Sequence, residues 1–311
     1  CIEGSPRVSG ANVRSRRCEG FRQRFLVTHF FNPVRYMKLL ELVAGEETLP
    51  EVVQAIHRFG EETLGKGIVY GKDTTNFIAN RIGVYSMMKT MREMERLGLS
   101  VEEIDAIFGP ALARPKSAVF RTADIVGLDT LVHVAENCHS TLPDDEERAV
   151  FAAPDFVKRM VAAGLLGEKS RKGFYAKVGK EIQSLDLATL QHKPQTQPAF
   201  ASLGAVRKVE DPGKRVAAVI AGDDKAAQIA ASVTLATLAY SARRIPEIAD
   251  DIVNIDRGLR WGFGWELGPF ELWDAIGVAA GVEKMKALGI AVPAWVEHML
   301  ASGRTSFYAV E

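Results

Sequence analysis

The sequence has no excess of charge of either sign. Lys and Arg together number 39, and Asp and Glu together also number 39, so the net charge is zero. Nucleic acids and anionic membranes attract proteins with a positive excess, so the balance indicates neither partner. Long apolar runs are missing as well. The most apolar stretch, residues 226–242, is interrupted by Gln, Ser and Thr, while a membrane span needs ~20 predominantly apolar residues. We expect a buried helix there and no membrane span.

Cysteine is scarce, with three residues at Cys1, Cys18 and Cys138. An odd number without metal-ligand spacing gives no metal motif and favours a reducing compartment over a disulfide framework. The sequence also lacks a signal-peptide pattern. We therefore expect a soluble, cytoplasmic protein with no metal site.

A complete dinucleotide-binding turn is lacking too. Such a turn is rich in glycine and joins a strand to a helix, so that backbone N–H groups can approach a pyrophosphate. The only approximation, "GFGWELG" at 262–268, follows a helical pattern, and no acidic residue lies at the usual distance on a second strand. We assign this segment to a loop and expect no complete cofactor site in the chain.

Residues 1–23 are rich in arginine, begin without methionine and show no hydrophobic period. A basic nucleic-acid arm and an unstructured or frameshifted leader are both consistent with this composition. The segment stays unassigned.

Beyond residue 23 the pattern becomes regular. "RFLVTHFF" (24–31), "YMKLLELV" (36–43) and "GIVYG" (67–71) have the composition of short strands, and Asn32-Pro33 predicts a turn between the first two. Before the third strand we expect a helix, with Thr48 as N-cap and Glu51 completing a capping box. These few elements are too little for an independent parallel sheet and indicate the end of a larger one.

From residue 74 onward the hydrophobic period is helical. Residues 76–98 place apolar side chains three and four positions apart, and Ser100 with Glu103 predicts a capping box for the next helix. Further helices are expected at 129–142 and 153–167. A polar stretch with prolines and no period, 183–213, predicts a linker.

Across this linker the chain partly repeats itself, since residues 102–129 align with residues 251–278. Each copy closes on a Phe-Tyr pair. The alignment predicts duplication of an all-helical unit. The aligned positions are Ile104 and Ile255, Asp105 and Asp256, Asp124 and Asp274, Gly127 and Gly277, and the pairs 174–175 and 307–308.

His29 lies near the end of the first strand, where α/β sheets bind ligands. A lone histidine among apolar residues is usually a hydrogen-bonded structural residue. Glu41 favours catalysis if the two strands are neighbours, because a carboxylate on one imidazole nitrogen leaves the other free to accept a proton. Asn80, in "KDTTNFIANR", offers an amide for a substrate carbonyl or for the histidine, and an exposed position in an ordinary helix start explains it equally well.

Four segments closely resemble the 3-hydroxyacyl-CoA dehydrogenases: "THFFNPVRYMKLLELV", "KDTTNFIANRIG", "EIDAIFGPALARPKSAVFRTADIVGLD" and "GLLGEKSRKGFYAK". The resemblance covers about residues 24–311. It implies oxidation of an (S)-3-hydroxyacyl-CoA to the 3-oxoacyl-CoA with NAD, in fatty-acid β-oxidation. It also implies the site residues, namely His29 as catalytic base, Glu41 as its orienting partner, Asn80 as a residue that positions substrate and histidine, and Asn32 in the catalytic loop near the cofactor.

The resemblance implies a mainly α fold. Residues 24–73 would be the C-terminal remnant of a Rossmann α/β domain. Two tandem helical domains of the 6-phosphogluconate-dehydrogenase C-terminal type would follow at 74–182 and 214–311, the second of them degenerate and structural. The tandem arrangement is similar to that of the longer bacterial members, in which an enoyl-CoA hydratase domain is fused to the dehydrogenase. A homodimer is consistent with this organisation.

The sequence departs from the family in two places. The Gly-rich half of the Rossmann domain is absent, and Asn76 stands where many relatives have Gly. We therefore expect an N- and C-terminally incomplete piece that is inactive on its own. Two alternatives remain open: a non-catalytic helical module for dimerisation or acyl-CoA binding, and a related hydroxyacid dehydrogenase with another substrate.

Overall fold

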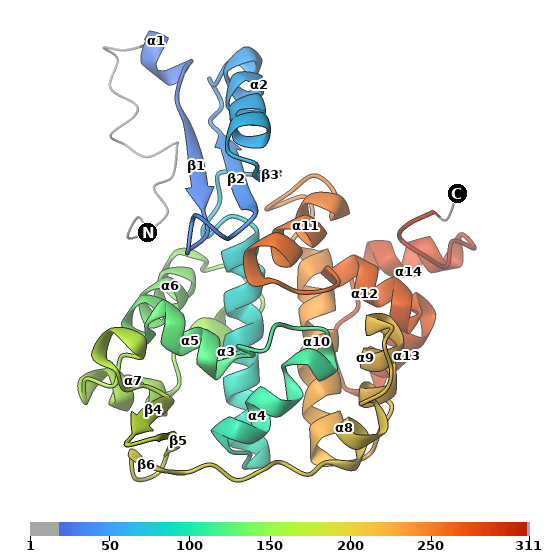
Figure 1. Ribbon diagram of the computed structural model, residues 1–311. Coiled ribbons are helices and arrows are strands. Elements are labelled where there is room, and N and C mark those ends of the chain that lie inside the picture. The colour runs from blue at the N-terminus through green and yellow to red at the C-terminus, as the bar shows by residue number, and fades with distance from the viewer. Residues whose placement is uncertain (1–18, 310–311) are drawn as a thin grey trace.

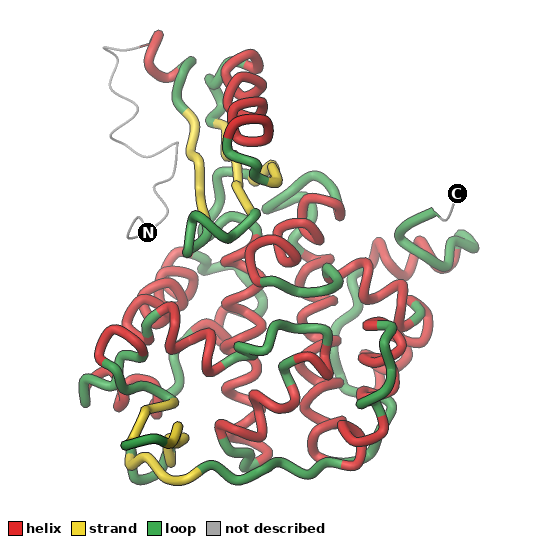
Figure 2. The backbone as a smooth tube through the Cα atoms, viewed as in Figure 1, coloured by secondary structure: helices red, strands yellow, loops and turns green. Residues whose placement is uncertain are grey.

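The computed structural model describes residues 19–309. A small three-stranded sheet stands at one end of a larger body of helices (Figure 1). Figure 2 shows that strands are confined to this sheet and to a second small one, so the described chain is mainly helical beside a small α/β unit. The predicted leader 1–23 lies outside the described residues, except for the end that carries the short helix α1 (Glu19–Arg22).

The N-terminal sheet has the strand order β1-β2-β3. β1 (Leu26–Phe30) is antiparallel to β2 (Leu39–Ala44), and β2 is parallel to β3 (Gly67–Gly71). The parallel pair needs a crossover connection, which is helix α2 (Pro50–Arg58), continued by the π-helical turn η1 (Phe59–Thr63). The predicted order of strand, turn, strand, helix and strand is confirmed.

Thr48 is not the N-cap of α2, so this prediction was wrong. Leu49 occupies the cap without a side-chain bond, and Pro50 begins the helix. Proline suits that position because it has a helical φ and no N–H to satisfy. The Thr48 hydroxyl instead accepts the Gly45 N–H (2.8 Å) and donates to the Phe25 carbonyl (2.6 Å).

The first group of helices follows β3. The longest, α3, ends at Gly98, whose φ of 65° lies in the left-handed region that glycine adopts readily. The capping box of Ser100 and Glu103 at the next helix is confirmed by both of its hydrogen bonds. The elements are α3 (Ala79–Leu97), α4 (Val101–Ile107), η2 (Pro110–Leu112), α5 (Phe120–Val126), α6 (Leu128–Thr141), η3 (Arg148–Phe151), α7 (Asp155–Ala162) and η4 (Glu168–Ser170).

The predicted linker, 183–213, contains regular structure, so this prediction was wrong in part. An antiparallel sheet is formed by β4 (Tyr175–Val178), β5 (Glu181–Asp186) and β6 (Gln191–Pro194), and helix α8 (Ala201–Ala205) follows. The strands are short and half exposed, so their composition is polar. β5 pairs with β4, which lies before the segment, and β6 pairs with β5.

The second group of helices comprises α9 (Pro212–Ile220), α10 (Lys225–Arg243), α11 (Ile252–Phe263), α12 (Pro269–Ile276), α13 (Val278–Ala287) and α14 (Ala294–Ala301). α10 runs beside α3 through the centre of the helical body (Figure 1). The two are antiparallel, since Lys225 at the start of α10 donates to the carbonyl of Leu97 at the end of α3 (3.0 Å). The assignment of "GFGWELG" to a loop was right only in part: Gly262 and Phe263 are the last two residues of α11, and residues 264–268 form the connection to α12.

The aligned carboxylates of the two sequence copies make matching contacts. Asp105 accepts backbone N–H groups around Phe120 and the Tyr175 hydroxyl, and Asp256 accepts those of Phe270 and Glu271 and the Tyr308 hydroxyl. In the same way, Asp124 accepts the N–H groups of residues 174–175, and Asp274 those of residues 307–308. Each carboxylate therefore closes the same type of turn in its own copy.

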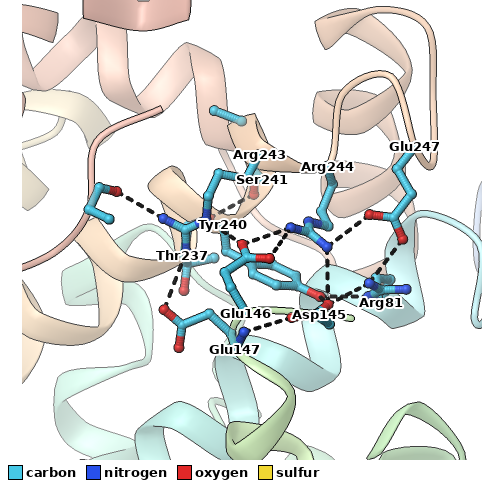
Figure 3. A network of polar contacts seen from close by, with 12 residues as sticks. Arg81, Asp145, Glu146, Glu147, Thr237, Tyr240, Ser241, Arg243, Arg244 and Glu247 are labelled. Atoms are coloured by element: carbon cyan, nitrogen blue, oxygen red, sulfur yellow. Dashed lines mark hydrogen bonds and ion pairs between the residues drawn. The ribbon is translucent and has the colours of Figure 1, made fainter. Parts of the chain in front are cut away.

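A buried polar network joins α3 to α10 (Figure 3). Arg81 of α3 donates to the Tyr240 hydroxyl (2.5 Å) and to Asp145 (2.5 Å), and Arg244 also donates to Asp145 (3.1 Å). Burial lowers the pKa of Arg81. Interactions with Tyr240, Glu247 and Asp145 raise it by more than burial lowers it, so the pKa lies above the ordinary value. The guanidinium stays charged and ties the two central helices together.

Within residues 19–309, none of the helices combines the length and the apolar character that crossing a membrane requires.

Candidate active site

His29 and Glu41 are direct partners across the antiparallel pair β1–β2. Directly opposed residues of such a pair present their side chains on the same face, close together. The imidazole Nδ1 lies 2.5 Å from Glu41 Oε2. The Glu41 side chain is completely buried, whereas that of His29 is 26% exposed. The condition that the sequence left open, that the two strands are neighbours, is therefore met.

The second oxygen of Glu41 is held by the start of α3. Oε1 accepts the backbone N–H of Ile78 (3.2 Å) and of Ala79 (2.9 Å). The first N–H groups of a helix have no partner within the helix and carry a partial positive charge. Three donors thus converge on one buried carboxylate, which is what a buried charge requires. Glu41 is fixed by backbone on one side and presents its other oxygen to His29.

The turn before α3 depends on Asn76. Its φ is 62°, in the left-handed region that asparagine tolerates better than most residues. This conformation is one that glycine also adopts readily. Its amide donates to the Val134 carbonyl (3.1 Å) and to Cys138 Sγ (2.8 Å), which anchors the turn to α6.

Two aromatic rings flank the imidazole. Phe31 lies with its centroid 5.0 Å from that of His29, and Phe77 lies at 5.6 Å, both edge-on. Within the described residues, no group bonds to Nε2 of His29. The rings and Glu41 therefore fix the plane of the imidazole and leave its second nitrogen available for a proton.

Asn80 and Asn32 lie on elements that border this pair, α3 and the turn after β1. Asn80 is half-buried on α3, one residue beyond Ala79, and in the described part of the chain no hydrogen bond connects it to His29 or Glu41. Asn32 is exposed in the turn that follows β1. The structure thus brings together two of the four predicted site residues, His29 and Glu41, and places Asn80 on the helix whose start binds Glu41 and Asn32 in the turn after β1.

Sequence reasoning missed the two N–H donors of Ile78 and Ala79. The signal was available, because the helical period begins at Ile78 and a helix start offers unpaired N–H groups. It also missed the approach of α11 to this region, for which the local sequence carries no signal because α11 is some 220 residues away along the chain.

The described residues do not fit the pyrophosphate of a dinucleotide. Among residues 19–309, β2 is the only strand from which a turn containing glycine, Gly45, leads into a helix. Glu46 and Glu47 follow it, and carboxylates repel an anion. The register pairs Ala44 with Leu26, so this turn also lies at the opposite end of β1 from His29. The same residues hold no group of three metal-ligating side chains.

Two family models match the chain. The NAD binding domain of 3-hydroxyacyl-CoA dehydrogenase matches residues 17–74, and the C-terminal domain of 3-hydroxyacyl-CoA dehydrogenase matches residues 77–177. The two matches adjoin each other at the turn that contains Asn76.

Known proteins resemble the chain over most of its length. A probable 3-hydroxyacyl-CoA dehydrogenase of Bacillus subtilis is 46% identical over 310 residues, which is 99% of this chain and 39% of that protein. A protein of Rickettsia felis named as a fatty acid oxidation complex trifunctional enzyme is 30% identical over 82% of this chain and 34% of its own length. The chain thus spans less than half of either relative.

The crystal structure of a 3-hydroxybutyryl-CoA dehydrogenase from Escherichia coli shares the fold. Its TM-score is 0.58 at 19% sequence identity, over 90% of this chain and 71% of that one.

Proposed function

Because the chain belongs to the 3-hydroxyacyl-CoA dehydrogenase family, we propose that it carries the catalytic part of an enzyme that oxidises (S)-3-hydroxyacyl-CoA to 3-oxoacyl-CoA with NAD, in fatty-acid β-oxidation. The observation that carries the proposal is the pair of His29 and Glu41, with Nδ1 and Oε2 at 2.5 Å and a buried carboxylate held by backbone. A structural histidine needs no such arrangement around its partner.

His29 acts as the base in this proposal. With Nδ1–H donated to Glu41, the free nitrogen is Nε2, which takes the proton of the substrate 3-hydroxyl. Glu41 fixes this tautomer and stabilises the imidazolium that forms. Since Glu41 is already bound by the two N–H groups of Ile78 and Ala79, it does not need to reorganise during the transfer.

NAD is the cofactor that the matched NAD-binding domain assigns, and a nicotinamide accepts a hydride. The described residues do not form a site for the pyrophosphate of NAD. The proposal therefore assigns them the proton transfer and not the binding of the cofactor. Asn80, one residue beyond Ala79, is proposed to orient the substrate carbonyl and the imidazole, and exposed Asn32 to lie in the catalytic loop beside the cofactor.

The domain organisation is part of the proposal. Residues 24–73 form the end of the NAD-binding domain, and 74–182 and 214–311 form tandem helical domains of the 6-phosphogluconate-dehydrogenase C-terminal type, joined through 183–213. The matching contacts of Asp105 and Asp256 support the duplication.

The partners are proposals as well. An acyl-CoA substrate follows from the proposed reaction, and a hydratase domain elsewhere in the whole protein is supported by the Rickettsia felis relative with its trifunctional name. A homodimer and a cytoplasmic location stay predictions from the sequence.

The test is a chimaera in which residues 24–311 follow the part of the Bacillus subtilis relative that precedes its counterpart of Arg24. It should bind NADH and reduce NAD with (S)-3-hydroxybutyryl-CoA but not with the R isomer. NADH fluorescence reports both. A folded chimaera that binds NADH and acyl-CoA without turnover would refute the proposal and favour a non-catalytic acyl-CoA-binding module.

A further inference from the structure

Helix α11 belongs to the second group of helices, yet it packs directly against the N-terminal sheet (Figure 1). Asn254 Oδ1 accepts the backbone N–H of Tyr70 at the edge of β3 (2.9 Å). Trp261 lies so close to Gly67 that a Cβ on this glycine would be 2.4 Å from the indole ring. The Lys38 ammonium stands 4.7 Å from the centroid of the same ring. α11 is therefore seated on the sheet by several independent contacts.

Two glycines of α11 bring its backbone close to the start of α3. A Cβ on Gly258 would lie 3.1 Å from Ile78, and one on Gly262 would lie 3.3 Å from Ala79 and 2.7 Å from Leu39. Ile78 and Ala79 are the residues whose N–H groups hold Glu41 Oε1. α11 therefore covers the backbone that fixes the carboxylate.

Phe263, at the end of α11, reaches the aromatic side of the site. Its ring fills the space over Gly83 of α3, where a Cβ would meet the ring tip at 2.1 Å. Its centroid lies 6.0 Å from that of Phe31 at an angle of 63°, and the Phe31 centroid lies 5.0 Å from that of His29. Phe31 thus stands between Phe263 and the imidazole.

These contacts give Phe263 a defined mechanical role. Phe31 is only partly buried and follows β1, so its ring has rotamer freedom unless something packs on its outer side. An unsupported ring would release the imidazole from one of its two flanking contacts. It would also admit water beside the Glu41 hydrogen bonds, and electrostatic interactions weaken as the local dielectric rises.

We propose that Phe263 is a positioning residue for His29, which acts by clamping Phe31 against the imidazole from the second half of the chain. The inference rests on the proposed function, in which His29 is the base, and it gives the second half a part in the site beyond holding its own fold. Phe263 touches neither the proton nor the substrate; it fixes the orientation of the group that does.

The test measures the imidazole directly and requires no cofactor or substrate. The 311-residue chain is labelled with ¹⁵N-histidine, His29 is assigned with the variant His29→Gln, and exchange of its Nδ1 proton with water is measured by NMR. Phe263→Ala should speed this exchange about tenfold or more, because hydrogen exchange reports local opening. Phe263→Leu should restore it to near the wild-type rate.

The matched control is Trp295→Ala. Trp295 packs on Phe270 and Phe307 within the second group of helices and donates to the Ala242 carbonyl (3.1 Å). This variant should lower the urea midpoint and leave the exchange at His29 unchanged. Unchanged exchange in folded Phe263→Ala, or an equal effect of Trp295→Ala, would overturn the proposal.

Gly83→Ala gives a second test that keeps the Phe263 side chain. The new methyl group must displace the ring, so exchange at His29 should rise in this variant. In the Phe263→Ala background the same methyl group meets no ring, and the added effect should be small. Additive effects of the two substitutions would contradict the clamp. An inactive chimaera would refute the proposed function and leave these measurements as they stand.

Discussion

At the scale of the residue, the site depends on how Glu41 is satisfied. Its carboxylate has no exposed surface and accepts one bond from His29 and two from the start of α3. An unpaired charge in such a place would cost several kcal/mol. Because backbone supplies two of the three donors, the carboxylate keeps its position when the imidazole changes its protonation. In the proposed reaction, this fixed carboxylate lets His29 take up the proton without rearrangement of the pair.

His29→Ala in the chimaera should lower kcat by roughly 10²–10⁴-fold, the usual contribution of a positioned acid–base group, with a smaller change in KM. Glu41→Gln should also lower kcat, because an amide supports the imidazolium less well than a carboxylate. Initial rates of NADH formation provide the measurement. His57→Ala is the control, since His57 pairs with the exposed Glu61 (3.2 Å) on the surface. Near-normal turnover by His29→Ala would remove His29 from the mechanism.

Asp256 gives a prediction about pH. Burial raises its pKa to about 7, although Phe270, Tyr308 and Glu271 donate hydrogen bonds to it. An unfolded aspartate titrates near ~3.9, so the folded chain holds a proton that the unfolded chain releases. This contribution to stability is complete below pH ~4 and is lost as the pH rises through about 7.

Urea unfolding at several pH values tests this. The stability of the wild type relative to Asp256→Asn should fall from pH 4 to pH 8, because asparagine does not titrate. Asp223→Asn is the matched control, because Asp223 is exposed. A constant difference between the wild type and Asp256→Asn would show that Asp256 has the same proton affinity in both states.

At the scale of the element, the antiparallel pair α3 and α10 forms the centre of the helical body. The rings of Tyr85 on α3 and Tyr240 on α10 stack with their centroids 4.0 Å apart. Arg81 of α3 binds Asp145 in the buried polar network (Figure 3). The same helix α3 begins with the N–H groups that hold Glu41. The position of α3 therefore determines both the packing against α10 and the placement of Glu41.

Arg81→Met should destabilise the fold by roughly 3 kcal/mol. This is the lower end of the range for removing one partner of a buried pair, because Arg244 still holds Asp145 at 3.1 Å. Urea denaturation measures the change. Arg96→Met, at the exposed end of α3, should change stability by no more than about 0.5 kcal/mol. A similar loss in both variants would show that the network contributes nothing specific.

At the scale of the whole molecule, the described residues contain the proposed catalytic pair without a site for the pyrophosphate of the cofactor. The described residues build the His29–Glu41 pair and the helices that support it, and none of them forms a pyrophosphate cradle. In the described part of the chain, β1 pairs only with β2, so its other edge is open. A sheet edge of this kind invites a further strand.

The 311-residue chain should therefore show no change in NADH fluorescence on titration, whereas the chimaera should show a saturable one. The comparison of the two proteins tests the pyrophosphate-binding turn alone, because His29 and Glu41 are the same in both. Circular dichroism checks that each is folded. Saturable micromolar binding of NADH to the 311-residue chain would mean that its residues complete a cofactor site by other means.

The sequence was sufficient for features that arise within a few residues of each other. The strand-type composition of 36–43 predicted β2, the period of 76–98 predicted α3, and Ser100 with Glu103 predicted a helix start. The alignment of Asp105 with Asp256 predicted equivalent positions, because the same local turn needs the same acceptor. Thr48 failed as a cap because Pro50 offered a competing local solution.

Other features were decided only by tertiary structure. The sequence named His29 and Glu41 as candidates, but only the register of β1 against β2 brings them to 2.5 Å, and a shift of one residue would have put them on opposite faces. The packing of Phe263 on Gly83 likewise joins segments whose own sequences carry no trace of the partner. Local periodicity records the hydrogen-bond geometry of a single helix or strand. Register and packing depend on the combined burial of residues far apart in the chain, and that becomes defined only when the whole chain has folded.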